Sequence, residues 1–99
     1  MYNSFDDAVH ALASEVANLV ISKQKDYGPR NILNCPVGAE NGIIVRLYDK
    51  LARVSHLIEK GKIPQNEALE DTWKDIIGYG LVALMVRRNV FELPLKEDE

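Results

Sequence analysis

The chain has 99 residues, of which 46% are hydrophobic and 27% are charged, so it can build one packed domain and is too short for two. Its formal net charge is −3 and it carries no basic block, which argues against binding of a long nucleic acid through many phosphate contacts. Its single cysteine cannot form an internal disulfide, so a reducing compartment, the cytoplasm, is the expected location.

The first predicted helix covers about residues 4 to 25. Apolar residues recur at steps of three and four over Phe5–Ile21, which is the period of an amphipathic helix. Ser4 followed by Asp7 resembles an N-cap pair, and the pair Gly28-Pro29 ends the helix. The sequence therefore begins with one long surface helix.

A long ordered loop is predicted from Asp26 to Gly42. This stretch is rich in Gly, Pro and Asn and follows neither the helical nor the strand period. Long ordered loops are more often functional than short ones. Asp26 places a negative charge near the negative end of the first helix, where it is unfavourable. Two interpretations of Asp26 stay open, a role in a binding site and a carboxylate that accepts hydrogen bonds from turn amides.

Two more helices are predicted, over about residues 43–60 and from after Pro64 to about residue 88. Gly61 ends the second helix, and Asn66 suits the N-cap of the third. The run 76–86 is apolar all round, so it must be covered on more sides than two other helices can reach. It is also shorter than the roughly 20 residues of a membrane span, so no membrane partner is expected.

These patterns predict one all-α domain over residues 1–99, with an acidic tail at about 95–99. We expect a small bundle of three main helices, with the long ordered loop after helix one. We also expect a dimer or higher oligomer that packs through helix three, because the apolar run needs a cover.

Two groups of charged residues each share one helix face. On the second helix the spacing is i, i+3, i+4 and i+7, and on the third it is i and i+4. The residues are Arg46, Asp49, Lys50 and Arg53, then Asp71 and Asp75. Because Asp75 leads directly into the apolar run, and a buried charge without a partner costs several kcal/mol, a cation should meet it.

Such a mixture of charges suits a phosphate ester or a nucleotide. Arg and Lys donate to phosphate oxygens, while aspartates that converge from facing helices can hold Mg²⁺. Four aromatic side chains can stack on a base, or can instead pack in the core or at an interface. They are Tyr27, Tyr48, Trp73 and Tyr79. The alternative for the charges is a solvated ladder of salt bridges, with Asp49 to Arg53 within one helix. Between the helices, Asp71 or Asp75 would reach Arg46 or Lys50.

Three segments together resemble a known family. They are KQKDYG at 23–28, RLYDKLAR at 46–53 and EALEDTWKDIIGY at 67–79. In this order they resemble the phage-enriched, all-helical nucleotide-modification-associated domain of the first type, once a domain of unknown function, over about residues 8 to 86. That family is in turn similar to the all-α nucleoside triphosphate pyrophosphohydrolases of the MazG kind, which cleave between the α and β phosphates with Mg²⁺.

The resemblance implies a set of site residues. The nucleotide site would be lined by Lys25, Asp26, Tyr27, Arg46, Lys50 and Arg53, to which we add the ring of Tyr79. The metal ligands would be Asp49, Asp71 and Asp75. The chain departs from the pyrophosphohydrolase pattern of Glu-x-x-Glu and Glu-x-x-Asp, because its second helix offers only Asp49 and Thr72 stands where the third should carry a Glu.

Three functions follow from these observations. The first is a small oligomeric phage-type protein that binds a nucleotide through the Arg and Lys of helix two, and that would be a Mg²⁺-dependent pyrophosphohydrolase if it is an enzyme. The low number of carboxylates favours binding over hydrolysis. The second is a non-catalytic sponge that sequesters a nucleotide immune signal in the host cytoplasm. The third is a structural helical adaptor whose charged faces are only salt bridges.

Overall fold

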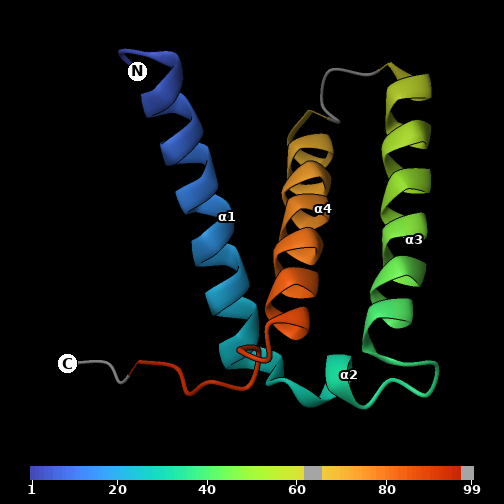
Figure 1. Cartoon of the computed structure of the whole chain (residues 1–99). Coiled ribbons are helices and arrows are strands. Elements are labelled where there is room, and N and C mark those ends of the chain that lie inside the picture. Colours follow the sequence, from blue (N-terminus) through green and yellow to red (C-terminus); the bar gives the residue numbers. More distant parts are fainter. Residues whose placement is uncertain (62–65, 97–99) are drawn as a thin grey trace.

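The computed structural model describes residues 1–61 and 66–96. Within these ranges the chain forms four helices and no strand (Figure 1). They are α1 (Phe5–Tyr27), α2 (Arg30–Leu33), α3 (Ala39–Lys60) and α4 (Asn66–Arg87). The predicted all-α class is therefore confirmed, and none of the helices in the described ranges is long and apolar enough to cross a membrane.

The ends of α1 follow from its local sequence. Ser4 caps the start, because its Oγ accepts a hydrogen bond from the backbone N–H of Asp7 at 3.0 Å. At the other end Gly28 has φ 68°, a conformation that favours glycine, and its N–H donates to the carbonyl of Gln24. The helix extends to Tyr27, two residues beyond the predicted end.

The predicted loop from residue 26 to 42 is shorter than expected. It contains the single-turn helix α2, and α3 begins at Ala39, about four residues before the predicted start. Gly42 lies inside α3 and is buried, and a Cβ built on it would lie 2.7 Å from Sγ of Cys35. The glycine that suggested a loop therefore lets the loop pack closely against a helix.

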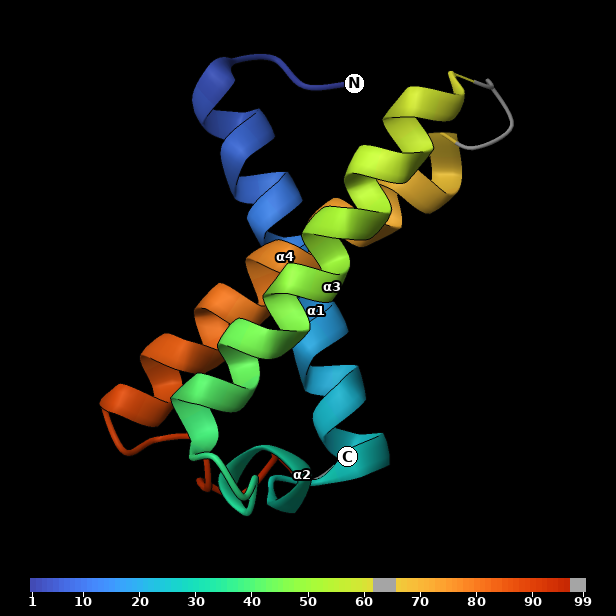
Figure 2. The same cartoon turned by 90° about the vertical axis from the view of Figure 1, so that its right-hand side faces the viewer.

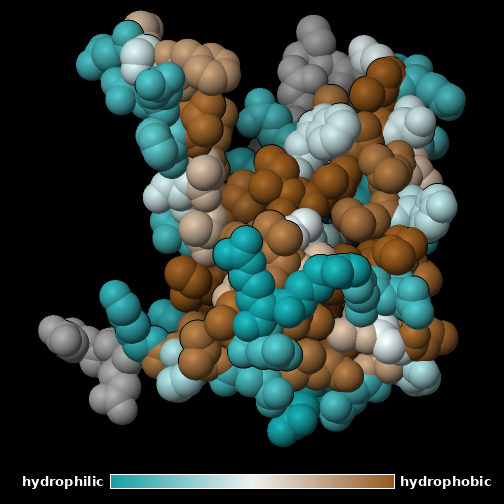
Figure 3. Space-filling model, viewed as in Figure 1, coloured by the Kyte–Doolittle hydropathy of each residue, from teal (hydrophilic) through white to brown (hydrophobic). Residues whose placement is uncertain are grey.

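The helices form one layer in which α4 stands between α1 and α3. α3 and α4 run antiparallel and pack side by side, while α1 packs on α4 and crosses it (Figures 1 and 2). The main core cluster takes one residue each from α2, α3, α4 and the segment after α4. These residues are Ile32, Ile43, Val82 and Phe91. Figure 3 shows hydrophobic residues gathered on the surface over α4 and α3.

The two halves of α1 differ in their surroundings. Val16 is buried, but Phe5, Val9 and Leu12, on the same helix face, are exposed. In Figure 1 this N-terminal half diverges from the other helices. Only the C-terminal half of α1 therefore packs in the bundle.

After α4 the chain folds back onto the core. Asn89 has φ 58°, and the N–H of Val90 donates to the carbonyl of Met85 at 3.0 Å, a hydrogen-bond pattern typical of helix ends. This turn brings Phe91 into the core, where it is 6% exposed. Of the predicted acidic tail the structure describes residues as far as Lys96, and residues 97–99 lie outside the description. The side chain of Asn66, the predicted N-cap, also lies outside it.

Candidate functional site

A pocket of about 330 Å³ lies where α1, α3 and α4 meet. This volume is within the roughly 300–1,000 Å³ range of small-molecule sites. Its polar lining consists of Lys23, Gln24, Asn31, Arg46, Lys50 and Asp75. Three aromatic residues also line it, Tyr27, Tyr79 and Phe91, together with aliphatic side chains of the core.

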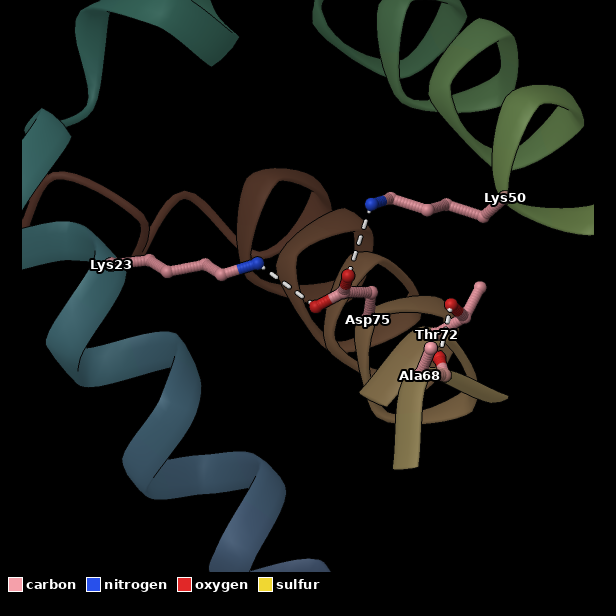
Figure 4. A network of polar contacts seen from close by, with 5 residues as sticks. All are labelled: Lys23, Lys50, Ala68, Thr72 and Asp75. Carbon is pink, nitrogen blue, oxygen red and sulfur yellow. Dashed lines mark hydrogen bonds and ion pairs between the residues drawn. The ribbon is translucent and has the colours of Figure 1, made fainter. Parts of the chain in front are cut away.

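Lys23 and Lys50 hold the carboxylate of Asp75 between them (Figure 4). Lys23 Nζ donates to Oδ1 at 2.9 Å, and Lys50 Nζ donates to Oδ2 at 3.0 Å. The side chain of Asp75 is only 17% exposed, whereas the two lysines are 44% and 30% exposed. This Asp75 triad joins α1, α3 and α4, and it confirms the prediction that a cation meets Asp75.

The surroundings of Asp75 favour its charged form. Partial burial alone raises the pKa of the Asp75 carboxyl, because it disfavours the anion. The hydrogen bonds and positive charges of Lys23 and Lys50 outweigh burial, so the pKa of Asp75 is lowered below its ordinary value. Asp75 is therefore an anion that both lysines share at neutral pH.

Two further polar side chains tie irregular segments to the pocket wall. Arg46 of α3 donates through Nη2 to the carbonyl of Asn31 at 3.2 Å. Gln24 of α1 donates through Nε2 to the carbonyl of Phe91 at 3.1 Å. The loop after α1 and the segment after α4 are therefore both fixed at the edge of the pocket.

The pocket contains four of the seven predicted ligand residues. They are Tyr27, Arg46, Lys50 and Tyr79. Lys25, Asp26 and Arg53 do not line it, and all three are exposed. Arg53 shares a face of α3 with Arg46 and Lys50 but lies one turn beyond the pocket.

Sequence reasoning missed Lys23 and Phe91. A signal for Lys23 existed, because it continues the face of α1 that carries Val16 and Val20, and a lysine on an apolar face often reaches a partner at its edge. Phe91 gave no such signal, because it follows the last helix in a segment without a period.

The structure brings two of the three predicted metal ligands close together. Asp75 lies in the pocket and also lines, with Asp71, a neighbouring hollow between α1 and α4. Asp49 is exposed on α3. Within residues 1–61 and 66–96 no three His, Cys, Asp or Glu side chains are grouped so that they could hold a metal ion. Both oxygens of Asp75 already accept from lysines, so the described carboxylates do not fit a multi-ligand Mg²⁺ site in this arrangement.

Thr72 occupies a structural position. It is buried, and its hydroxyl donates to the carbonyl of Ala68 at 2.7 Å (Figure 4). The position at which the pyrophosphohydrolase pattern has a Glu is therefore filled by a side chain that is satisfied within its own helix.

The predicted salt-bridge ladder is only partly formed. Lys50 pairs with Asp75 across the helices, but none of the ion pairs in the described ranges joins Asp49 to Arg53. Lys50 and Asp75 thus belong to the pocket and not to a continuous ladder along a solvated helix face.

The pocket as a whole offers more positive than negative charge. Lys23, Arg46 and Lys50 face a single carboxylate, Asp75, and aromatic rings stand beside them. Such a combination can bind an anionic group and stack on a flat ring. No family model, curated protein or solved structure matches the chain.

Proposed function

We propose that the protein binds a nucleotide in this pocket, with the phosphate at Lys23, Arg46 and Lys50 and the base beside Tyr27 or Tyr79. The observation that supports this best is the convergence of cations from α1 and α3 on one pocket that aromatic rings also line. If the charged residues served only as salt bridges on a solvated face, there would be no reason for them to line a pocket together with aromatic rings. The resemblance of the sequence to a nucleotide-modification-associated domain points the same way.

The donors and charges of the pocket suit a phosphate monoester. Each lysine ammonium has three donors, and Asp75 uses one donor of Lys23 and one of Lys50, so further donors stay available for a ligand. Three cations against one carboxylate leave a surplus of positive charge. A phosphate monoester, which carries about −1.5 to −2 at neutral pH, would balance that surplus.

The size of the pocket favours a mononucleotide. Its volume of about 330 Å³ is at the lower end of small-molecule sites, which span roughly 300–1,000 Å³. A larger, multiply phosphorylated ligand would extend into solvent, toward the exposed residues Lys25 and Arg53 that the resemblance also implies.

We propose binding without efficient turnover. Hydrolysis with Mg²⁺ stays a prediction, and it would require Asp75 to leave both lysines and act with Asp49 and Asp71. A binder of this kind would sequester its nucleotide, which is the behaviour of the sponge described above. Its phage origin, its place in the host cytoplasm and its oligomeric state stay predictions that accompany this proposal.

The test is calorimetry with nucleoside 5′-mono-, di- and triphosphates, in Mg²⁺ and in chelator, together with an assay for released phosphate and pyrophosphate. The decisive variant is Arg46→Ala, which removes a pocket cation without touching the Asp75 triad. Its matched control is Arg53→Ala, on the same face of α3 but outside the pocket. Loss of a partly desolvated charged contact costs about 2–5 kcal/mol, so Arg46→Ala should weaken binding by about thirtyfold or more.

The control variant should bind nucleoside monophosphates like the parent. If the parent binds none of the nucleotides, the proposed function is wrong. If Arg46→Ala and Arg53→Ala both bind like the parent, the ligand lies elsewhere. Rapid Mg²⁺-dependent release of pyrophosphate from a triphosphate would show that the protein hydrolyses its nucleotide, and the proposal of binding without turnover would then be wrong.

A further inference from the structure

The pair of helices α3 and α4 exposes a broad apolar face. Six side chains define this hairpin face, and each of them is between 45% and 71% exposed. They are Ile44, Tyr48 and Leu51 of α3 and Trp73, Ile77 and Leu84 of α4. Figure 3 shows hydrophobic residues gathered over these two helices. Exposed apolar patches of this kind mark interaction surfaces.

Helix geometry places the two stripes on one side of the pair. In α3, Ile44 directly follows the buried Ile43, and in α4, Trp73 directly follows the buried Thr72. Each residue is rotated by about 100° around the helix axis from the one before it. Because α3 and α4 are antiparallel, the residue that follows the buried one faces the same side of the helix pair in both helices. The exposed stripes therefore form a single surface.

α1 packs against a different side of α4. A Cβ built on Gly78 would lie 3.3 Å from Val20 of α1, and Asp75 binds Lys23 of α1. By contrast, nothing in the described part of the chain lies within 4 Å of a Cβ built on Gly80, which belongs to the stripe of Trp73. The hairpin face thus lacks a cover from the described helices.

We infer that a second copy of this chain covers the hairpin face. A compact monomer of 11.2 kDa exposes about 5,700 Å² by the scaling of surface with mass, whereas this chain exposes 7703 Å². Part of the difference comes from the N-terminal half of α1. The whole excess is about 2,000 Å², and an interface of standard size would cover roughly 800 Å² on each partner.

The composition of the face fits contact with itself. In a two-fold dimer the same patch meets its own copy, so a face with net charge would repel its partner. Ser55 and Gly80 add no charge to the two stripes. At one end of the face the charges of Glu40 and Arg87 neutralise each other in an ion pair at 2.8 Å. Trp73 and Tyr48 are residue types enriched at the centre of interfaces, and Gly80 permits close approach of the two α4 helices. The sequence predicted contact through helix three alone, and the structure adds α3 to that surface.

Two measurements test this inference. Light scattering of the parent at micromolar concentration should give at least twice the chain mass of 11.2 kDa. Trp73 is the single tryptophan of the chain and lies on the face, so its emission should shift to longer wavelength as the protein is diluted and the dimer dissociates.

The decisive variant is Ile77→Glu, and its matched control is Ser14→Glu, which adds the same charge at an exposed position of α1. Because Ile77 is exposed in the single chain, the variant should keep the helical circular dichroism of the parent. It should raise the dissociation constant about a hundredfold or more, because two unpaired carboxylates would be buried. The control should keep the parent's mass.

A parent that stays monomeric on concentration would overturn the inference. An Ile77→Glu variant that keeps the mass and the Trp73 emission of the parent would also overturn it. Neither outcome bears on nucleotide binding, which is measured separately.

Discussion

Lys23 of α1 and Asp75 of α4 are 52 positions apart in the chain, and their side chains meet at 2.9 Å. Lys50 of α3 binds the other oxygen of the same carboxylate at 3.0 Å. One aspartate thus fixes the three long helices around the pocket and at the same time orients two of its cations. Fold stability and ligand binding should therefore respond together to changes at this position.

The first prediction concerns stability and pH. The folded state lowers the pKa of Asp75 below its ordinary value of about 3.9, so the stabilising contribution is complete above that value. It is lost as the pH falls further, through the lower pKa of the folded state. At neutral pH, Asp75→Asn should lower the free energy of unfolding by about 1.5–3 kcal/mol, the range for hydrogen bonds to a charged group.

Urea unfolding of the parent and of Asp75→Asn, measured from neutral to acid pH, checks this prediction. The difference between the two proteins should shrink as the pH falls below about 4. Asp49→Asn is the matched control at an exposed position of α3, and it should change stability by no more than about 0.5 kcal/mol. A constant difference between the parent and Asp75→Asn at every pH would contradict the role of the triad.

The second prediction tests which lysine of α1 contacts the nucleotide. The structure points to Lys23, whereas the resemblance implies Lys25. Lys23 lines the pocket and Lys25, two residues further along α1, does not. Lys23→Ala should weaken nucleotide binding about tenfold or more, because a charged donor is lost from a partly desolvated site. Lys25→Ala should have a much smaller effect. If calorimetry shows that Lys25→Ala binds the nucleotide more weakly than Lys23→Ala, then Lys25 is the ligand-binding lysine, as the resemblance implies.

The third prediction concerns the contact between the loop and α3. A methyl group on Gly42 would lie 2.7 Å from Sγ of Cys35, which cannot be accommodated without movement. Gly42→Ala should therefore destabilise the fold by about 1–3 kcal/mol, the usual cost of overpacking.

Urea unfolding of a double-mutant cycle checks this prediction. Combining Gly42→Ala with Cys35→Ala removes the sulfur and should recover part of the lost stability. Additive losses in the double variant would show that the two side chains do not conflict.

The fourth prediction concerns the segment after α4. Phe91 is buried in the core cluster and also lines the pocket, so Phe91→Ala should lower the free energy of unfolding by about 3–5 kcal/mol. Leu93→Ala, two residues further along and exposed, should change it by less than about 0.5 kcal/mol. Thermal unfolding of both variants makes the comparison, and equal melting temperatures would mean that Phe91 does not pack in the core in solution.

The helices were largely predictable because their signals are local. Ser4 and the Gly28-Pro29 pair mark the ends of α1, and Gly61, with φ 62°, ends α3 as its position indicated. The start of α3 was not predictable in this way, because Gly38 and Gly42 suggest a turn. Gly42 lies inside the helix, where its lack of a side chain leaves room for Cys35, and this contact is invisible in the local pattern.

The site was predictable in part, for a related reason. The cations of α3 share one helix face, so their spacing placed Arg46 and Lys50 together. The position of Asp75 directly before the apolar run required a cation. The spacing could not decide that Arg53 lies beyond the pocket, since that depends on where α1 crosses α4. The contribution of Phe91 depends on a turn at Asn89, whose positive φ no helical period could indicate.

The divergence of α1 from the other helices has a consequence for amide hydrogen exchange. Phe5, Val9 and Leu12 are exposed in the half of α1 that diverges from the other helices, so the amide protons of that half should exchange through its own fraying. From Val16 onward the same helix is held by the core and by Lys23, so exchange there should require opening of the whole bundle. A single continuous helix should therefore show two exchange regimes, with the boundary close to Glu15, where Lys74 of α4 forms an ion pair at 2.8 Å.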